Sequence, residues 1–153
     1  MNKLKISWQQ FHKDTLELSK QLLKHYPFAG ILAVSRGGLI PATIIAQDLN
    51  VRLLDTICIK SYNDTTRCEP TVIKSPELLG NGKGWLVIDD LVDSGNTTRF
   101  IRELFPEILI ATVYAKPIGK PFTDLYAVDI PQDAWVVFPH EEFNEPPQLK
   151  LSL

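Results

Sequence analysis

Residues 85–97 read WLVIDDLVDSGNT, and they carry the strongest structural signal in the chain. Their first four residues are apolar, which is typical of a strand buried in a parallel sheet. Two carboxylates, Asp89 and Asp90, are expected to end this strand, and a run of small and hydroxyl side chains then opens a helix. A strand, a loop and a helix in this order indicate one unit of an α/β fold, in which ligands bind at the carboxyl ends of the strands.

The alternation of strands and helices continues on both sides of this stretch. Ser7 and Gln10 form a capping-box pattern before an amphipathic helix that is expected to reach about residue 25 and carries Trp8, Phe11, Leu18 and Leu22 at helical spacing. Further helices are expected at 39–49 and 97–105, and strands at 30–35, 51–59, 85–88, 108–115, 126–130 and 135–138. This order predicts a mostly parallel sheet flanked by helices, in a single domain that spans residues 1–153.

The composition argues against several classes of protein. A chain of 153 residues is about the size of one domain, and its 44% hydrophobic and 22% charged residues argue against disorder and a coiled coil. A formal charge of −2 argues against a nucleic-acid-binding protein that works by bulk positive charge. The longest apolar runs, of about eight residues, are too short for a transmembrane helix. No signal-peptide pattern opens the chain, and Cys58 and Cys68 have no metal-site spacing, so a cytoplasmic location is expected.

The loop that follows the two carboxylates suits a phosphate group. It offers hydroxyl groups, backbone N–H groups and the positive end of a helix, from Ser94, Gly95, Asn96 and Thr97. Asp89 and Asp90 can accept hydrogen bonds from ribose hydroxyls or contact a hydrated Mg²⁺ ion. An acidic pair alone could simply end a strand on the solvent side, but Asp93 and the hydroxyl-rich loop favour a ribose 5-phosphate site.

These residues resemble the phosphoribosyl pyrophosphate (PRPP) signature of the type I phosphoribosyltransferases. The resemblance covers about residues 4–140 in order. Three further stretches resemble the bacterial xanthine-guanine branch of that family: AVSRGGLIP (33–41), AKP (115–117) and DIPQDAW (129–135). It implies the type I phosphoribosyltransferase fold, a mostly parallel sheet with a small hood. It also implies a purine salvage reaction with Mg²⁺, in which PRPP and a 6-oxopurine (guanine, xanthine or hypoxanthine) give a nucleoside monophosphate and pyrophosphate.

The resemblance implies roles for the residues that match the family's phosphate and metal contacts. Arg36 and Gly37 would form the pyrophosphate loop, in a peptide that the family holds in an unusual cis or strained form, whereas the residues alone also allow a plain Gly-Gly turn. Asp90 would contact Mg²⁺, which offsets the charge of the departing pyrophosphate. The implied PRPP and pyrophosphate contacts are Arg36, Gly37, Asp89, Asp90, Asp93, Ser94, Gly95, Asn96 and Thr97.

Four residues match the family's purine contacts. Asp93 would act as the general base near purine N7, although it can also cap the following helix. Lys116 would bind the purine O6 and select 6-oxopurines over adenine, because an ammonium group only donates hydrogen bonds; on its own it could be an ordinary exposed lysine. Trp135, which could otherwise be a core residue, would stack on the base, and the Val136 carbonyl would meet its 2-substituent. The ranking of the three bases stays open.

The remaining implications concern the lid, the tail and the assembly. The polar segment 61–71 matches a mobile lid, with Arg67 as a pyrophosphate contact. Asn96 stands where close relatives carry Gly, and Asn tolerates a positive φ better than most residues. The tail, about 139–153, diverges from the family. The resemblance implies a homo-oligomer, commonly a tetramer, and allows peripheral association with the inner face of the cell membrane.

Two other classes of protein compete with the enzyme interpretation. A non-enzymatic PRPP-sensing regulator shares the fold and the phosphate loop, but the presence of Asp93, Lys116 and Trp135 and the charge of −2 argue against it. A receiver domain also ends a strand in two aspartates. There the acidic pair follows the first strand, whereas here it lies at 89 and 90 and is followed by a phosphate loop.

Overall fold

The computed structural model describes residues 2–60 and 70–141. Three α-helices and three short 3-10 helices occur in this part of the chain: α1 (Trp8–Leu22), η1 (Leu23–His25), α2 (Leu39–Asp48), α3 (Asn96–Leu104), η2 (Lys120–Phe122) and η3 (Pro139–Glu141). The strands are β1 (Asn2–Lys5), β2 (Gly30–Ser35), β3 (Leu54–Lys60), β4 (Thr71–Lys74), β5 (Trp85–Val92), β6 (Leu109–Ala115), β7 (Leu125–Asp129) and β8 (Ala134–Val137). Within these ranges, no helix has the length and hydropathy that a membrane span requires.

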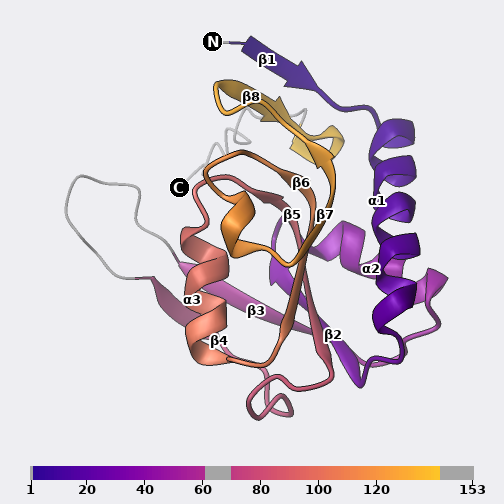
Figure 1. Cartoon of the computed structure of the whole chain (residues 1–153), viewed down its shortest axis with the longest axis vertical. Helices are drawn as coiled ribbons and strands as arrows, with labels where there is room; N and C mark the ends of the chain where they lie inside the picture. The colour runs from indigo at the N-terminus through magenta and orange to yellow at the C-terminus, as the bar shows by residue number, and fades with distance from the viewer. Residues whose placement is uncertain (1, 61–69, 142–153) are drawn as a thin grey trace, which may run out of the picture.

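The main sheet has six strands in the order β4-β3-β2-β5-β6-β7 (Figure 1). All neighbouring pairs are parallel except β3 and β4, which are antiparallel. The expected mostly parallel α/β sheet is therefore confirmed. The carboxyl ends of β2, β5 and β6 meet at one edge, called here the carboxyl edge, which is where an open α/β sheet binds its ligands.

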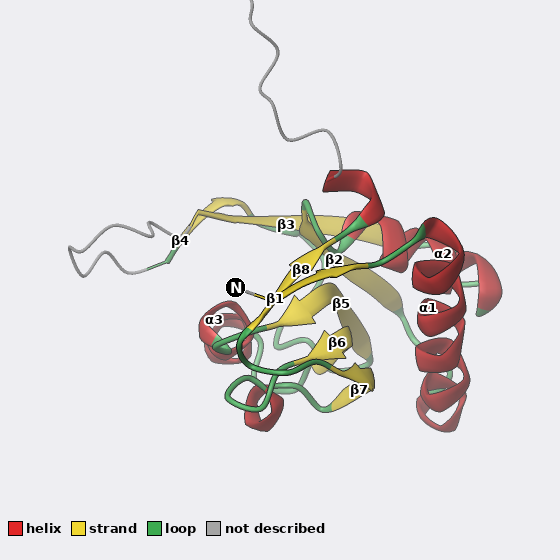
Figure 2. Cartoon of the chain, turned by 90° about the horizontal axis from the view of Figure 1, so that it is seen from above, coloured by secondary structure: helices red, strands yellow, loops and turns green. Residues whose placement is uncertain are grey.

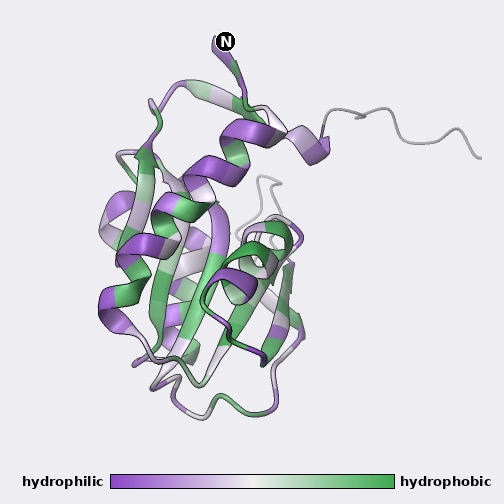
Figure 3. Cartoon of the chain, turned by 90° about the vertical axis from the view of Figure 1, so that its right-hand side faces the viewer, coloured by the Kyte–Doolittle hydropathy of each residue, from purple (hydrophilic) through white to green (hydrophobic). Residues whose placement is uncertain are grey.

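Helices cover both faces of this sheet, with α1 and α2 on one side and α3 on the other (Figure 2). Alternate residues of β2 enter two separate cores: Ile31 and Ala33 pack with the helices α1 and α2, and Leu32 and Val34 pack with α3. Successive side chains of a strand point to opposite faces, so a strand covered on both sides needs a continuous apolar run. In Figure 3 the strands are accordingly mostly green, whereas α1 alternates between green and purple.

Strand β5 is longer than expected. The two carboxylates were expected to end it, but it continues through Asp89 and Asp90 to Val92. The reason is that β5 pairs with β6 from Leu86 to Val92, with Asp89 opposite Thr112. Pairing with a neighbouring strand thus outweighs the low strand propensity of aspartate, and both carboxylates project from a rigid element.

Other differences concern short or exposed segments. The strand expected at 51–59 begins only at Leu54, and β1 and β4 were not expected. Ser7 caps α1 as expected, since its Oγ accepts a hydrogen bond of 3.1 Å from the Gln10 N–H, whereas the Gln10 side chain donates forward to Asp14 Oδ1 at 2.7 Å. Trp8 does not share the buried face of α1, because 56% of its surface is exposed.

The small hood consists of the parallel pair β1 and β8. Lys3 lies opposite Trp135 and Leu4 opposite Val136, and the Ile6 N–H donates to the Val137 carbonyl at 3.0 Å. Figure 1 shows this pair beyond the carboxyl edge of the main sheet. The strand that carries Trp135 is therefore held by the first residues of the chain, a long-range pairing that the local sequence does not predict.

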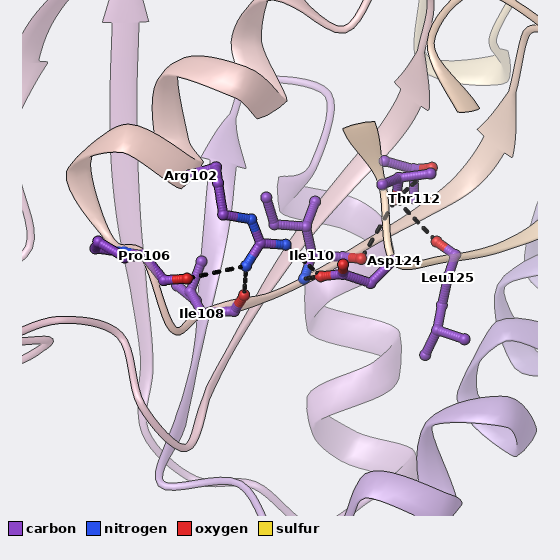
Figure 4. A network of polar contacts seen from close by, with 8 residues as sticks. Arg102, Pro106, Ile108, Ile110, Thr112, Asp124 and Leu125 are labelled. Carbon is purple, nitrogen blue, oxygen red and sulfur yellow. Dashed lines mark hydrogen bonds and ion pairs between the residues drawn. The ribbon is translucent and has the colours of Figure 1, made fainter. Parts of the chain in front are cut away.

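A polar network holds the C-terminal part of α3 against the start of β6, away from the carboxyl edge (Figure 4). Arg102 Nη1 donates to the carbonyls of Ile108 and Pro106, and its Nη2 pairs with Asp124 Oδ2 at 2.5 Å. The same Asp124 oxygen accepts a hydrogen bond from the Ile110 N–H at 2.8 Å. An exposed ion pair alone contributes little, but these bonds also satisfy backbone groups between α3 and β6. They anchor the helix whose first turn carries the candidate phosphate loop.

Candidate active site

A cleft of about 730 Å³ opens at the carboxyl edge. Its walls come from the end of β2 and the loop after it, from β3 and β4, from the acids of β5 and from η3. The lining residues are Val34, Ser35, Arg36, Gly37, Cys58, Ile59, Lys60, Ile73, Asp89, Asp90, Thr97, His140 and Glu141. The cleft therefore brings together Arg36, Gly37, Asp89, Asp90 and Thr97, which the sequence assigned to one PRPP site.

The acid pair of the cleft is held by the backbone next to it. The Asp90 N–H donates to Asp89 Oδ1 at 2.9 Å, and the Leu91 N–H donates to Asp90 Oδ1 at 2.7 Å. Burial, and the charge of Asp90 beside it, raise the pKa of Asp89 well above its usual range. Burial also raises the pKa of Asp90. Ionising two neighbouring buried carboxylates costs free energy. A divalent cation or a set of hydroxyl donors between them would lower this cost, so the pair suits such a ligand.

The loop after β2 packs directly against this acid pair. A Cβ atom on Gly37 would lie 2.4 Å from Asp90 Oδ2, and one on Gly38 would lie 2.3 Å from the Ile88 carbonyl oxygen. Only glycine allows the loop backbone to come so close to β5. In this loop the cis peptide bond is Ser35–Arg36, which is one bond before the Arg36–Gly37 peptide named from the resemblance.

A second, smaller cavity lies between β5 and α3 and has a volume of about 110 Å³. Its lining includes Asp93, Ser94, Gly95, Asn96 and Thr97. Thus the whole predicted phosphate loop surrounds a single small cavity at the start of a helix, an arrangement that suits a phosphate group.

Gly95 supplies the special backbone conformation of this loop. It adopts φ 87°, and a Cβ atom there would lie 2.2 Å from Phe122 Cδ2. Asn96 is the first residue of α3, and among the described residues the one non-glycine with positive φ is Asn50. The positive φ considered for Asn96 is therefore not needed, because the preceding glycine already makes the turn.

Asp93 and Lys116 meet at the same edge. Lys116 Nζ lies 3.0 Å from Asp93 Oδ2, and only 7% of the lysine surface is exposed. Lys116 is thus not an ordinary surface lysine. The N-cap residue of α3 is Gly95, and the Asn96 N–H at the start of the helix donates to Ser94 Oγ at 3.4 Å, so Asp93 does not have the capping role that was its alternative. Its carboxylate is 56% exposed and can still reach a ligand.

The two residues expected to hold a base lie on the hood. Trp135 is 58% exposed and is therefore not a core residue, whereas Val136 is buried. The turn before β8 is joined to the sheet by the hydrogen bond from the Ile130 N–H to the Ala115 carbonyl, at 2.9 Å. This bond places β8 next to the end of β6, where Lys116 begins the following turn.

Several cleft residues were missed by sequence reasoning, His140 and Glu141 among them, and one predicted residue lies outside the described ranges. His140 and Glu141 line the cleft from η3, and the His140 ring stacks on Phe138 with centroids 5.5 Å apart. No periodicity in the tail marks them, because their position depends on where the chain turns after β8. Arg67 and most of the expected lid, residues 61–69, lie outside the described residues.

Comparisons with known proteins agree with this arrangement. A family model described as a phosphoribosyl transferase domain matches residues 7–149. The chain is 48% identical over 137 residues to the xanthine-guanine phosphoribosyltransferase of Gluconobacter oxydans, covering 88% of this chain and 82% of the relative. It is 50% identical over 134 residues to that of Chromohalobacter salexigens, covering 88% and 81%.

Solved structures show the same fold. A purine phosphoribosyltransferase from Pyrococcus horikoshii superposes with a TM-score of 0.80 at 29% identity, covering 95% of this chain and 99% of the other. A xanthine-guanine-hypoxanthine phosphoribosyltransferase from Helicobacter pylori superposes with a TM-score of 0.77 at 26% identity, covering 92% and 95%.

Proposed function

Because the chain belongs to the phosphoribosyltransferase family, we propose that it is a purine salvage enzyme. It transfers the phosphoribosyl group of PRPP to guanine, xanthine or hypoxanthine and releases pyrophosphate; the relatives from Gluconobacter oxydans and Chromohalobacter salexigens carry the name xanthine-guanine phosphoribosyltransferase. The observation that carries this proposal is the ion pair between the buried Lys116 and the half-exposed Asp93, which lies beside the phosphate loop at the carboxyl edge. A donor and an acceptor at this place match the O6 and N7 edge of a 6-oxopurine.

The PRPP half of the substrate would occupy the two cavities. The 5-phosphate suits the loop from Ser94 to Thr97, where hydroxyl and N–H donors surround about 110 Å³. The ribose hydroxyls suit the carboxylates of Asp89 and Asp90. The pyrophosphate suits the loop of Arg36 and Gly37, which packs against Asp90 in the same cleft.

Mg²⁺ fits the acid pair as a cofactor shared with the substrate. Carboxylate oxygens are the ligands that Mg²⁺ prefers, and this ion usually binds one or two carboxylates together with substrate phosphates and water. In the ranges 2–60 and 70–141 no group of three or more ligating side chains forms a metal cage. Asp90, with Asp89 beside it, would hold the ion, and the ion would offset the charge of the departing pyrophosphate.

Asp93 and Lys116 would act on the purine. In the transfer, a bond forms between the base and C1 of the ribose while the bond from C1 to pyrophosphate breaks. Asp93 would accept the proton that leaves N7 as the base becomes electron-poor. Lys116 has three N–H donors, of which one faces Asp93, so the others can bind O6. Trp135 supplies an exposed ring for stacking.

The choice of base tests this proposal. We expect nucleotide formation from at least one of guanine, xanthine and hypoxanthine, and none from adenine, because the exocyclic amine of adenine is a donor that would face the donor Lys116. The measurement is chromatographic separation of nucleotide products from reactions that differ only in the base. PRPP binding without any product would instead support the PRPP-sensing regulator.

Replacing Lys116 by Ala should weaken binding of the base far more than binding of PRPP. Loss of a hydrogen bond from a charged donor should raise KM for the base roughly 10–100-fold and leave KM for PRPP within about two-fold. Steady-state kinetics with each substrate varied in turn measures both. Lys83→Ala, which removes an exposed lysine far from the cleft, is the matched control. Equal losses for the two substrates would mean that Lys116 has a structural role.

For the assembly, the proposal is a cytoplasmic homo-oligomer, a tetramer as the resemblance implies, that can lie against the inner face of the cell membrane. The exposed side chains of Leu53 and Leu54 support contact between copies, since 43% and 37% of their surfaces are accessible in the single chain. Light scattering on the purified protein measures the number of copies, and flotation with vesicles measures membrane binding.

A further inference from the structure

Gln132 joins the three segments that would surround the purine. Its Nε2 donates to Asp93 Oδ1 at 3.0 Å, and its Oε1 accepts from the backbone N–H of Ile118 at 3.0 Å. Gln132 itself lies in the turn between β7 and β8, where the Ala134 N–H bonds to the Pro131 carbonyl at 3.1 Å. One amide group therefore connects the loop after β5, the turn after β6 and the turn before β8.

Only one orientation of this amide satisfies both neighbours. An ionised carboxylate offers only acceptors and a backbone N–H only a donor, so Nε2 must face Asp93 and Oε1 must face Ile118. The turn after β6 is itself well fixed, because the Gly119 N–H and the Lys120 N–H both bond to the Lys116 carbonyl at 3.0 Å. Gln132 therefore holds the Asp93 side chain at a fixed position relative to this turn.

The Asp93 carboxylate depends on such support. Packing does not hold it, since 56% of its side chain is exposed. Lys116 Nζ binds Oδ2 and Gln132 Nε2 binds Oδ1, so these two donors fix the rotation of the carboxylate between them. Without the glutamine, one donor remains, and a carboxylate held at one oxygen can turn about its Cβ–Cγ bond.

We propose that Gln132 is a positioning residue for Asp93, which keeps that carboxylate in the plane where it accepts the proton of the purine. The proposal rests on the proposed function, because it assigns Gln132 an effect only on the step that Asp93 performs. If Gln132 merely stiffened the turn before β8, its loss would lower the melting temperature and leave no specific effect on kcat.

A double-mutant cycle separates these two roles. The four proteins are the wild type, Gln132→Leu, Asp93→Ala and the double variant, all as the full chain. Gln132→Leu is expected to lower kcat roughly 10–100-fold, the usual effect of misplacing a reacting group, with KM for PRPP within about two-fold. In the Asp93→Ala background the same change should have no further effect on kcat, because the group that Gln132 positions is gone. Equal losses in both backgrounds would overturn the proposal.

A second variant guards against a folding defect in Gln132→Leu. Gln132→Glu keeps the chain length and the acceptor for the Ile118 N–H, but it loses the donor to Asp93. Its kcat should also fall at least about ten-fold, and wild-type kcat would overturn the proposal. Gln9→Leu, at an exposed glutamine of α1, is the control for solubility. Failure of the wild type itself to make nucleotide would count against the proposed function, and is therefore distinguishable.

Discussion

The Asp93→Asn variant should form nucleotide roughly 10²–10⁴-fold more slowly than the wild type, because a general base usually contributes that much to the rate. The amide keeps the size of the carboxylate but cannot take the proton that leaves the purine as the new glycosidic bond forms. Asp89, Asp90 and the phosphate loop are not altered, so PRPP should bind within about three-fold of the wild-type affinity. Nucleotide formation under saturating substrates measures the first quantity, and calorimetric titration with PRPP measures the second.

Asp133→Asn is the matched control for this prediction. It removes the same charge from an exposed carboxylate in the turn that precedes β8, and kcat should not change. If Asp93→Asn works at the wild-type rate, Asp93 is not the base. If PRPP binding falls together with turnover, Asp93 acts mainly in holding the phosphate loop.

Gly37→Ala should abolish most PRPP binding without unfolding the protein. The new Cβ atom would lie 2.4 Å from Asp90 Oδ2 and 2.6 Å from its Cγ, so one of the two must move. The loop has little room to shift, because the Gly38 N–H bonds to the Val34 carbonyl at 2.8 Å and even a Cβ atom on Gly38 would lie 2.3 Å from the Ile88 carbonyl oxygen. The Asp90 carboxylate is therefore displaced, and an error of about 1 Å at such a contact weakens function roughly 10²-fold.

Titration with PRPP and Mg²⁺ measures this loss, and a melting curve shows whether the fold survives. Gly80→Ala is the comparison: it has nothing within 4 Å but a positive φ of 55°, so it should cost about 1 kcal/mol of stability and leave PRPP affinity unchanged. Wild-type PRPP affinity in Gly37→Ala would show that the position of Asp90 is not critical, contrary to the proposed metal contact.

The parts of the fold that local sequence predicts are those in which local and long-range signals agree. The run 30–35 carries apolar residues for both faces of the sheet, and it forms β2 with the expected bounds. In β5, by contrast, local propensity ends the strand at Asp89, whereas pairing with β6 carries it to Val92. The four residues of β1 give no local signal at all, since their role comes from pairing with β8.

The candidate site shows the same division. The residue types at Asp89, Asp90 and 94–97 are enough to suggest a phosphate and metal site, because their chemistry is local to one stretch of the chain. The hydrogen bonds from Gln132 to Asp93 and to Ile118 join segments that only the folded sheet brings together. Such contacts have no local pattern, so sequence reasoning identified Asp93 but not the group that orients it. Whether residues 1–153 form a single domain stays a prediction.

The transfer reaction itself tests the central claim most directly. With Mg²⁺, PRPP and guanine, the wild-type chain is predicted to form guanosine monophosphate and pyrophosphate in equal amounts, both quantified in one sample by phosphorus NMR as PRPP disappears. The double variant Asp89→Ala, Asp90→Ala should form neither above the rate of the uncatalysed mixture. Intact PRPP after prolonged incubation of the wild type with guanine, xanthine and hypoxanthine in turn would contradict the account.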